Sequence, residues 1–357
     1  MCGFESIVDQ QQPIRILTTL IRNETIPHAL LFTGIDGVGK KTVATIFAMA
    51  CNCTGKGRGY LSEDRRSQAE NGHHSNNQPA TITPCGSCKS CGKIQSGNHP
   101  DIIHIEPSGP FIRIDQIRAL CHTLAMKPYE ARLRIVIISD AQTMNPAAGN
   151  ALLKMLEEPP DRTILILTAG QTSDLLPTIV SRCRHIRFNP ISRKNLTAML
   201  VKKQGFGLDD SNVIANLANG SFSKALSITR QMNRIFWIDR RNWLITASGL
   251  DYQSSLPSRP ISSLLAFAEA LSKNKETLFD SLEVIKSWLR DLVVFKYCPE
   301  KIINKDLSDT VQYASKNNTI KSILAKFEAV EAADKDIQAN ANLRLTLEKL
   351  IIRLASV

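Results

Sequence analysis

Short apolar runs alternate with helical patterns through the first half of the chain. Four of these runs are rich in β-branched residues and bounded by polar or turn residues, namely Ala29–Thr33, Ile102–Ile105, Ile135–Ile138 and Ile164–Leu167. Such runs are typical of strands buried on both faces of a parallel sheet. Between them, Asn145 and Pro146 form a helix start, and the helix that follows ends at Glu157-Glu158-Pro159-Pro160. The alternation predicts a three-layer α/β domain over residues 1–189.

Helical periodicity takes over after about residue 190. Apolar residues recur on one helical face in Leu282–Leu292 and again in Leu343–Leu354. Two prolines in Ser254–Pro260 are typical of a linker. We therefore predict a small helical domain over 190–250 and a larger one over 261–357.

One segment of the first half breaks the alternation. Residues 54–84 contain few apolar side chains among glycine, serine, asparagine, glutamine and charged residues. A segment of this composition buries too little apolar surface to offset the entropy of ordering. It is predicted to be a mostly disordered insertion.

The charge balance indicates an acidic partner without naming it. The 357 residues carry a net charge of +11, which suits nucleotide or nucleic acid. Aromatic residues make up only 6% and do not interleave with the basic ones, so stacking on single strands is not favoured. The start of the chain lacks the apolar core of a signal peptide, and no stretch suits a membrane helix. A cytoplasmic protein with reduced thiols is predicted, in which clustered cysteines indicate metal.

A glycine-rich loop follows the first predicted strand and precedes a helical pattern. Its characteristic residues are Gly34, Gly37, Gly39 and Lys40. In this context the backbone N–H groups surround phosphate oxygens, and the lysine reaches the β- and γ-phosphates. The next residue is Lys41 where Ser or Thr would hold Mg²⁺, and Thr42 comes one residue too late. The loop predicts that ATP can bind, with hydrolysis impaired.

A second expected catalytic position is also altered. In a hydrolysing P-loop protein the third predicted strand, Ile135–Ile138, would end in a Mg²⁺-organising Asp followed by Glu. The Asp position holds Ser139 or, with a shift of one, Asp140, and no Glu follows in either register. A degenerate nucleotide site is therefore favoured over an active ATPase.

Three cysteines, Cys85, Cys88 and Cys91, repeat with two residues between them. This spacing wraps one tetrahedral ion, and a fourth thiolate would complete a structural zinc site. Cys53 is the preferred fourth ligand; the alternatives left open are Cys51, His73, His74 and His99. Together with the net charge, the cluster also raises the alternative of a zinc-dependent nucleic-acid-binding module.

The tripeptide Ser181-Arg182-Cys183 lies after the fourth predicted strand, just before the chain becomes helical. An arginine at such a domain edge can project into a neighbouring subunit's nucleotide site as an arginine finger. The tripeptide alone is weak evidence for an arginine finger, and it is the position in the chain that supports this interpretation.

Taken in order, the motifs resemble those of the clamp-loader AAA+ family of bacterial DNA polymerase III. They are the apolar run after Pro27-His28, the glycine-rich loop, the cysteine cluster, Pro128-Tyr129-Glu130, Ser139-Asp140-Ala141, Asn150–Pro160 and Ser181-Arg182-Cys183. The resemblance covers residues 5–230 well and the C-terminal third loosely. It implies that 1–189 is an AAA+-type core with an inserted zinc module (about 51–91), 190–250 a lid, and 261–357 a collar for oligomerisation.

Two kinds of subunit in that family carry these motifs. Gamma and tau hydrolyse ATP, whereas delta-prime has a decayed nucleotide site and acts as a stator. Lys41, Ser139-Asp140 and Ser223 each replace a residue that the motor subunits use. The resemblance therefore favours the delta-prime type, with a gamma/tau-type ATPase as the alternative.

The resemblance also implies partners and a role. A clamp loader is a hetero-oligomeric ring that places the sliding clamp on primed DNA, as part of a nucleotidyltransferase holoenzyme. Gamma/tau and delta subunits would be the direct partners. Arg182 would serve the ATP bound by a neighbouring subunit, with Ser181 and Cys183 beside it.

Overall fold

The computed structural model describes residues 3–55, 82–231, 234–247, 260–273, 275–304, 307–339 and 341–356. These residues form two compact units, one of 1–195 with 220–224 and one of 196–219 with 225–357. The predicted three-domain division is finer than this and stays a prediction. Most of the predicted insertion 54–84 and of the linker 254–260 falls outside the described residues.

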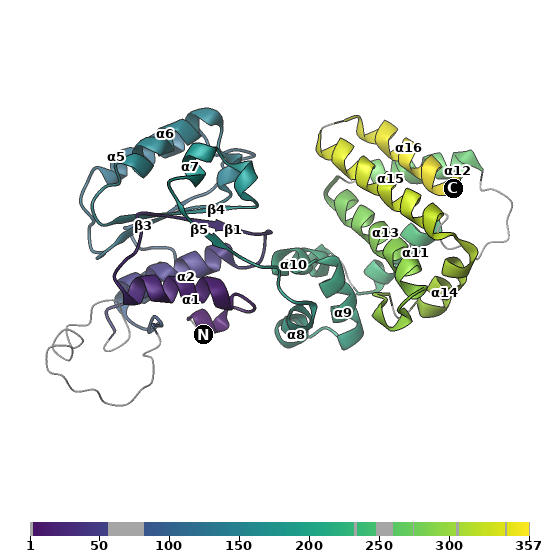
Figure 1. Cartoon of the computed structure of the whole chain (residues 1–357), viewed down its shortest axis with the longest axis horizontal. Helices are drawn as coiled ribbons and strands as arrows, with labels where there is room; N and C mark the ends of the chain where they lie inside the picture. Colours follow the sequence, from purple (N-terminus) through teal and green to yellow (C-terminus); the bar gives the residue numbers. More distant parts are fainter. Residues whose placement is uncertain are drawn as a thin grey trace. The chain divides into compact units, whose positions relative to one another are not determined.

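The first unit is built on a five-stranded parallel sheet with the order β2-β3-β4-β1-β5 (Figure 1). The strands are β1 (Ala29–Thr33), β2 (Ile102–Ile105), β3 (Arg134–Ile138), β4 (Thr163–Ala169) and β5 (Arg184–Arg187). The sheet and its four predicted strands are confirmed. Because all strands run in the same direction, the loops after their carboxyl ends emerge at one edge of the sheet.

Helices cover both faces of this sheet (Figure 1). On one face lie α1 (Gln11–Arg22), α2 (Lys40–Asn52) and α4 (Lys89–Gln95); on the other lie α5 (Ile114–Leu124), α6 (Pro146–Glu157) and α7 (Pro177–Val180). Successive residues of a strand point to opposite faces, so Leu30 and Phe32 pack with the first set and Ala29 and Leu31 with the second. The predicted three-layer α/β arrangement is confirmed. Short 3₁₀ turns lie at Phe4–Ser6, Ala141–Thr143 and Thr172–Asp174.

Helix α6 begins as the sequence predicts. The side chain of Asn145 accepts a hydrogen bond from the Ala148 N–H at 2.8 Å, and Pro146 takes the first helical position. The strand β5 was not predicted. Its sequence is Arg-His-Ile-Arg, and only Ile186 is buried, so an edge strand with one inward side chain leaves no apolar run to detect.

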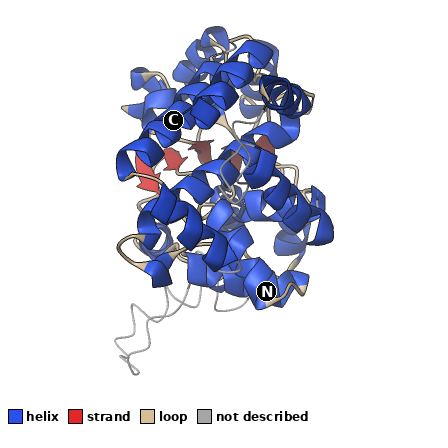
Figure 2. Cartoon of the chain, turned by 90° about the vertical axis from the view of Figure 1, so that its right-hand side faces the viewer, coloured by secondary structure: helices blue, strands red, loops and turns tan. Residues whose placement is uncertain are grey.

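The second unit is helical, and the strands, red in Figure 2, belong to the first unit. Its helices are α9 (Leu208–Leu217), α11 (Arg234–Ala247), α12 (Ile261–Ser272), α13 (Lys275–Phe295), α14 (Ser308–Asn317), α15 (Ile320–Gln338) and α16 (Leu343–Ser356), with a 3₁₀ turn at Pro299–Lys301. Two more, α8 (Arg193–Gln204) and α10 (Phe222–Gln231), cross the unit boundary. Trp288 and Leu350 are among its fully buried core residues, as their helical spacing predicts. Within the described ranges, no helix combines the length and apolarity needed to cross a bilayer.

Candidate nucleotide, metal and arginine sites

The glycine-rich loop joins β1 to α2 at the carboxyl edge of the sheet, the position in which a P-loop works. Gly37 has φ +78°, and a Cβ placed there would lie 2.5 Å from the Ser221 Oγ. The Phe222 N–H also donates a hydrogen bond to the Gly37 carbonyl at 3.1 Å. The segment 220–224 therefore lies directly on the loop, and only glycine fits beneath it.

Lys40 is buried, with 6% of its surface exposed. Its ammonium donates to the carbonyls of Gly34 and, at 3.2 Å, of Ile35, and it pairs with Asp36 at 3.2 Å. The Lys40 ammonium, which would contact a phosphate, is thus bonded to groups of its own loop. A bound nucleotide would have to take these contacts over.

Lys41, at the Mg²⁺-ligand position, forms an ion pair with Glu106, directly after β2. The hydrogen bond and the charge of Lys41 hold the pKa of the Glu106 carboxyl below its usual range. Thr42 lies one residue further along α2 and is exposed. The position that would hold a metal ligand is therefore occupied by a paired cation, and an ammonium group cannot ligate a metal.

The end of β3 offers no replacement. Ser139 is buried, and Asp140 sits in a left-handed turn with φ +52°, its N–H donating to the Thr168 Oγ1 at 3.1 Å. In the described structure no hydrogen bond or ion pair joins Asp140 to Lys40 or Lys41. That the acidic end of β3 is degenerate, as the sequence indicates, stays a prediction.

Arg182 follows the short helix α7. One of its terminal nitrogens pairs with Glu157 at 2.8 Å, and the other donates to the Thr178 carbonyl at 3.0 Å. The Ser181 hydroxyl donates to the same carbonyl at 3.1 Å. Burial raises the pKa of the Cys183 thiol to about 11, so this neighbour stays protonated at neutral pH. Arg182 therefore lies in a turn that several hydrogen bonds hold in place, and its side chain remains partly exposed.

Four cysteine sulfurs meet near the end of α2 and the start of α4. Cys53, Cys85, Cys88 and Cys91 have their Sγ atoms within 4.8 Å of one another, and the group can hold a metal ion. In a tetrahedral zinc–thiolate site, bonds of about 2.3 Å place the sulfurs about 3.8 Å apart, so this donor set fits zinc. Backbone N–H groups of Cys85, Cys88 and Cys91 donate to the preceding sulfurs at 3.3–3.4 Å, as thiolates need.

The structure separates the candidates for the fourth ligand. Cys53 belongs to the cluster, whereas Cys51 is fully buried outside it and His99 accepts a hydrogen bond from the Asp101 N–H at 3.2 Å. His73 and His74 lie outside the described residues. The geometry favours Cys53, the ligand preferred from the sequence.

Comparison with known proteins places the chain in a family. The sequence model for "DNA polymerase III, delta subunit" matches residues 9–192, more than half of the chain, and the model for its C-terminal part matches residues 250–356. The chain belongs to the DNA polymerase III delta-subunit family.

Individual relatives come from the same replication machinery. The chain is 28% identical to DNA polymerase III subunit delta' of Bacillus subtilis, over 97% of this chain and 96% of that protein. It is 26% identical to subunit tau/gamma of Haemophilus influenzae, over 98% of this chain but only 49% of that longer protein. A solved structure of a gamma-subunit-related protein from Thermotoga maritima is similar over 96% of this chain and 99% of its own, with 18% identity and a TM-score of 0.41.

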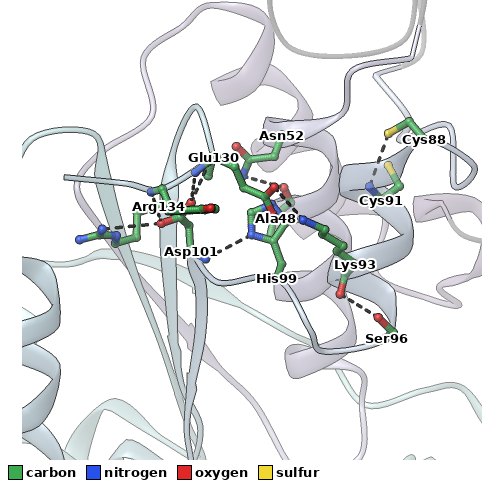
Figure 3. Close-up of polar contacts among 12 residues, drawn as sticks. Ala48, Asn52, Cys88, Cys91, Lys93, Ser96, His99, Asp101, Glu130 and Arg134 are labelled. Carbon is green, nitrogen blue, oxygen red and sulfur yellow. Dashed lines mark hydrogen bonds and ion pairs between the residues drawn. The ribbon is translucent and has the colours of Figure 1, made fainter. Parts of the chain in front are cut away.

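In this member of the delta-subunit family, a buried polar network lies next to the cysteines (Figure 3). Asp101 accepts hydrogen bonds of 2.8 Å from the N–H groups of Tyr129, Glu130 and Ala131, and it lies 3.6 Å from the guanidinium of Arg134. Burial raises the pKa of Asp101, but these hydrogen bonds and the charge of Arg134 outweigh it, and the net shift is downward. The network fastens the loop before β3 to the start of β2.

Arg134 serves a second element. It donates to the Met126 carbonyl at 2.7 Å and the Thr123 carbonyl at 3.2 Å, beyond and within the last turn of α5. The Thr123 carbonyl also accepts from the Met126 N–H at 3.4 Å, and the buried guanidinium gives both carbonyls a charged donor at the end of α5. Neither Asp101 nor Arg134 was predicted from the sequence as a site residue.

Substituting Asp101 by Asn is expected to lower the free energy of unfolding by about 3–5 kcal/mol, because it leaves Arg134 buried and unpaired. The lowered pKa means that the carboxylate stabilises the fold fully above its unfolded pKa of about 3.9, and that this stabilisation is lost as the pH falls through the folded value. Denaturant titrations at pH 7 and pH 3 would measure both effects. Asp115→Asn, at an exposed residue 3.9 Å from Arg118, is the control. Equal losses in the two variants at pH 7 would contradict this role.

Proposed function

We propose that the chain is a delta-prime-like stator subunit of the DNA polymerase III clamp loader, working in the cytoplasm. It would assemble with gamma/tau and delta subunits into a hetero-oligomer and help to place the sliding clamp on primed DNA. The similarity to subunit delta' over nearly the whole of both chains supports this role. Gamma/tau relatives of similar identity keep the motor subunit as the alternative.

The observation that carries the proposal is the ion pair between Lys41 and Glu106. Hydrolysis by a P-loop protein needs Mg²⁺ held by the hydroxyl after the loop lysine, and a residue that orients the attacking water. The position of the Mg²⁺-holding hydroxyl is taken by Lys41, a cation paired with Glu106. Asp140 is followed by Ala141, which cannot orient the attacking water. ATP binding through Lys40 is compatible with these changes, whereas catalysis by this chain is not.

The isolated chain is therefore expected to release phosphate from Mg-ATP no faster than background. Steady-state phosphate release by the purified full chain measures this. The variant Lys41→Thr restores the missing hydroxyl, and it should stay inactive because no water-orienting Glu follows β3. Robust turnover by the unmodified chain would favour the gamma/tau alternative.

Two further parts of the proposal rest on the sites described above. Arg182 would act as an arginine finger on ATP bound by an adjacent gamma or tau subunit, with Ser181 and Cys183 fixing its turn. Cys53, Cys85, Cys88 and Cys91 would hold a structural zinc ion that ties α2 to α4. A zinc closed by four thiolates has no open position for water, so no catalytic step is assigned to it.

A further inference from the structure

We propose that Glu157 is a positioning residue for the arginine finger; this inference rests on the proposed function of Arg182. The Glu157 carboxylate accepts from one terminal nitrogen of Arg182 at 2.8 Å, and the Thr178 carbonyl accepts from the other at 3.0 Å. The guanidinium plane is thereby fixed at two points. Of its five N–H donors, those not used by these contacts are left to meet a phosphate.

Both partners come from elements that hold their places firmly. Glu157 is the last residue of α6, and Arg182 follows α7, where its N–H donates to the Ile179 carbonyl at 3.2 Å. Helix α6 packs on the start of α7 at Gly149, where a Cβ would lie 3.1 Å from the Cδ1 of Leu176, the residue before α7, and 3.8 Å from the Ile179 Cδ1 of α7. The Glu157–Arg182 pair therefore sets the direction of the side chain relative to the core of the subunit.

The exposure of the pair argues for orientation rather than for a role in folding. The Arg182 side chain is 37% exposed and that of Glu157 51% exposed. An ion pair this open to water contributes little to the stability of a protein. An arginine side chain, however, has many rotamers, and a finger that is already held in one direction loses less entropy when the neighbouring nucleotide arrives.

The test uses the full loader, reconstituted from this chain with the gamma/tau and delta subunits of the same organism, clamp and primed DNA. The variants are E157A, E157Q, R182A and the double variant E157A/R182A. The matched control is E158A, because Glu158 is an exposed neighbour of the same charge with no ion pair among the described residues. We expect E157A to lower kcat for ATP hydrolysis about tenfold while KM for ATP changes less than about twofold, because misplacement of the finger affects the transition state and not nucleotide binding.

The remaining arms separate positioning from other roles. E157Q keeps an oxygen acceptor and should retain more of kcat than E157A, and E157A should add no further loss to R182A. Melting temperatures of the E157A and E158A chains should agree within about 2 °C. Wild-type kcat in E157A, an additional loss in the double variant, or a selective drop in melting temperature for E157A would each overturn the positioning role. Wild-type hydrolysis in R182A would instead overturn the proposed function itself.

Discussion

Replacing Arg182 by alanine is expected to slow ATP hydrolysis at the adjacent subunit's site of the assembled clamp loader about 10³- to 10⁵-fold. A trans arginine finger donates to the transferring γ-phosphoryl group and neutralises charge that develops only in the transition state, so its loss lowers kcat more than it weakens nucleotide binding. Because Arg182 is partly exposed and its partners are one carboxylate and one carbonyl, the substitution leaves the core intact. The measurement is steady-state phosphate release by the reconstituted loader with clamp and primed DNA.

Two comparisons make this result specific. Arg184→Ala removes an arginine of the same charge two residues away, whose side chain is exposed on β5, and should hydrolyse at the wild-type rate. Arg182→Lys keeps the charge but loses the two-pronged geometry, and should fall between wild type and alanine. Size-exclusion chromatography checks that each variant still assembles. Unchanged hydrolysis in Arg182→Ala, or an equal loss in Arg184→Ala, would exclude the arginine-finger role.

The local parts of these sites follow from the sequence because their residues are close along the chain. The glycine-rich loop spans the seven residues Gly34–Lys40, and three of the cysteines fall in another stretch of seven, Cys85–Cys91. Their spacing alone therefore indicates phosphate binding and metal binding. The buried strands are likewise apparent from their apolar runs. Cys53 is harder, since 31 residues separate it from Cys85, and only the folded chain brings the two sulfurs together.

The long-range contacts that position the side chains of these sites cannot be predicted from residue spacing. Glu157 and Arg182 lie far apart in the sequence and meet only because α6 packs on α7. Asp101 accepts hydrogen bonds from backbone N–H groups of the loop before β3. Because every residue except proline has such a group, no pattern of residue types indicates this contact. Lys41 was identified as a departure from the P-loop motif, but its partner Glu106 depends on how α2 lies over the sheet.

Loss of the proposed zinc ion from the cysteine cluster is the second change with a large expected effect. Elemental analysis of protein purified without chelator should find about one zinc per chain. At a free zinc concentration a thousand times the Kd, the ion stabilises the folded unit by about 4 kcal/mol, so a strong chelator or Cys88→Ser should lower its melting temperature by roughly 8–16 °C. The melting temperature falls because, without the ion, the remaining cysteine side chains must stay close together either as thiolates that repel one another or as protonated thiols.

The control for the zinc prediction is another cysteine of the same unit. Cys121 is a half-buried free thiol on α5, and it does not belong to the sulfur cluster. Cys121→Ser should keep the full zinc content and a melting temperature near that of wild type, whereas Cys53→Ser should behave like Cys88→Ser because both remove one of four ligands. A chain free of zinc with an unchanged melting temperature would show that the cluster is a set of packed thiols. Loss of zinc in Cys88→Ser but not in Cys53→Ser would instead remove Cys53 from the ligand set and direct the search for the fourth donor elsewhere.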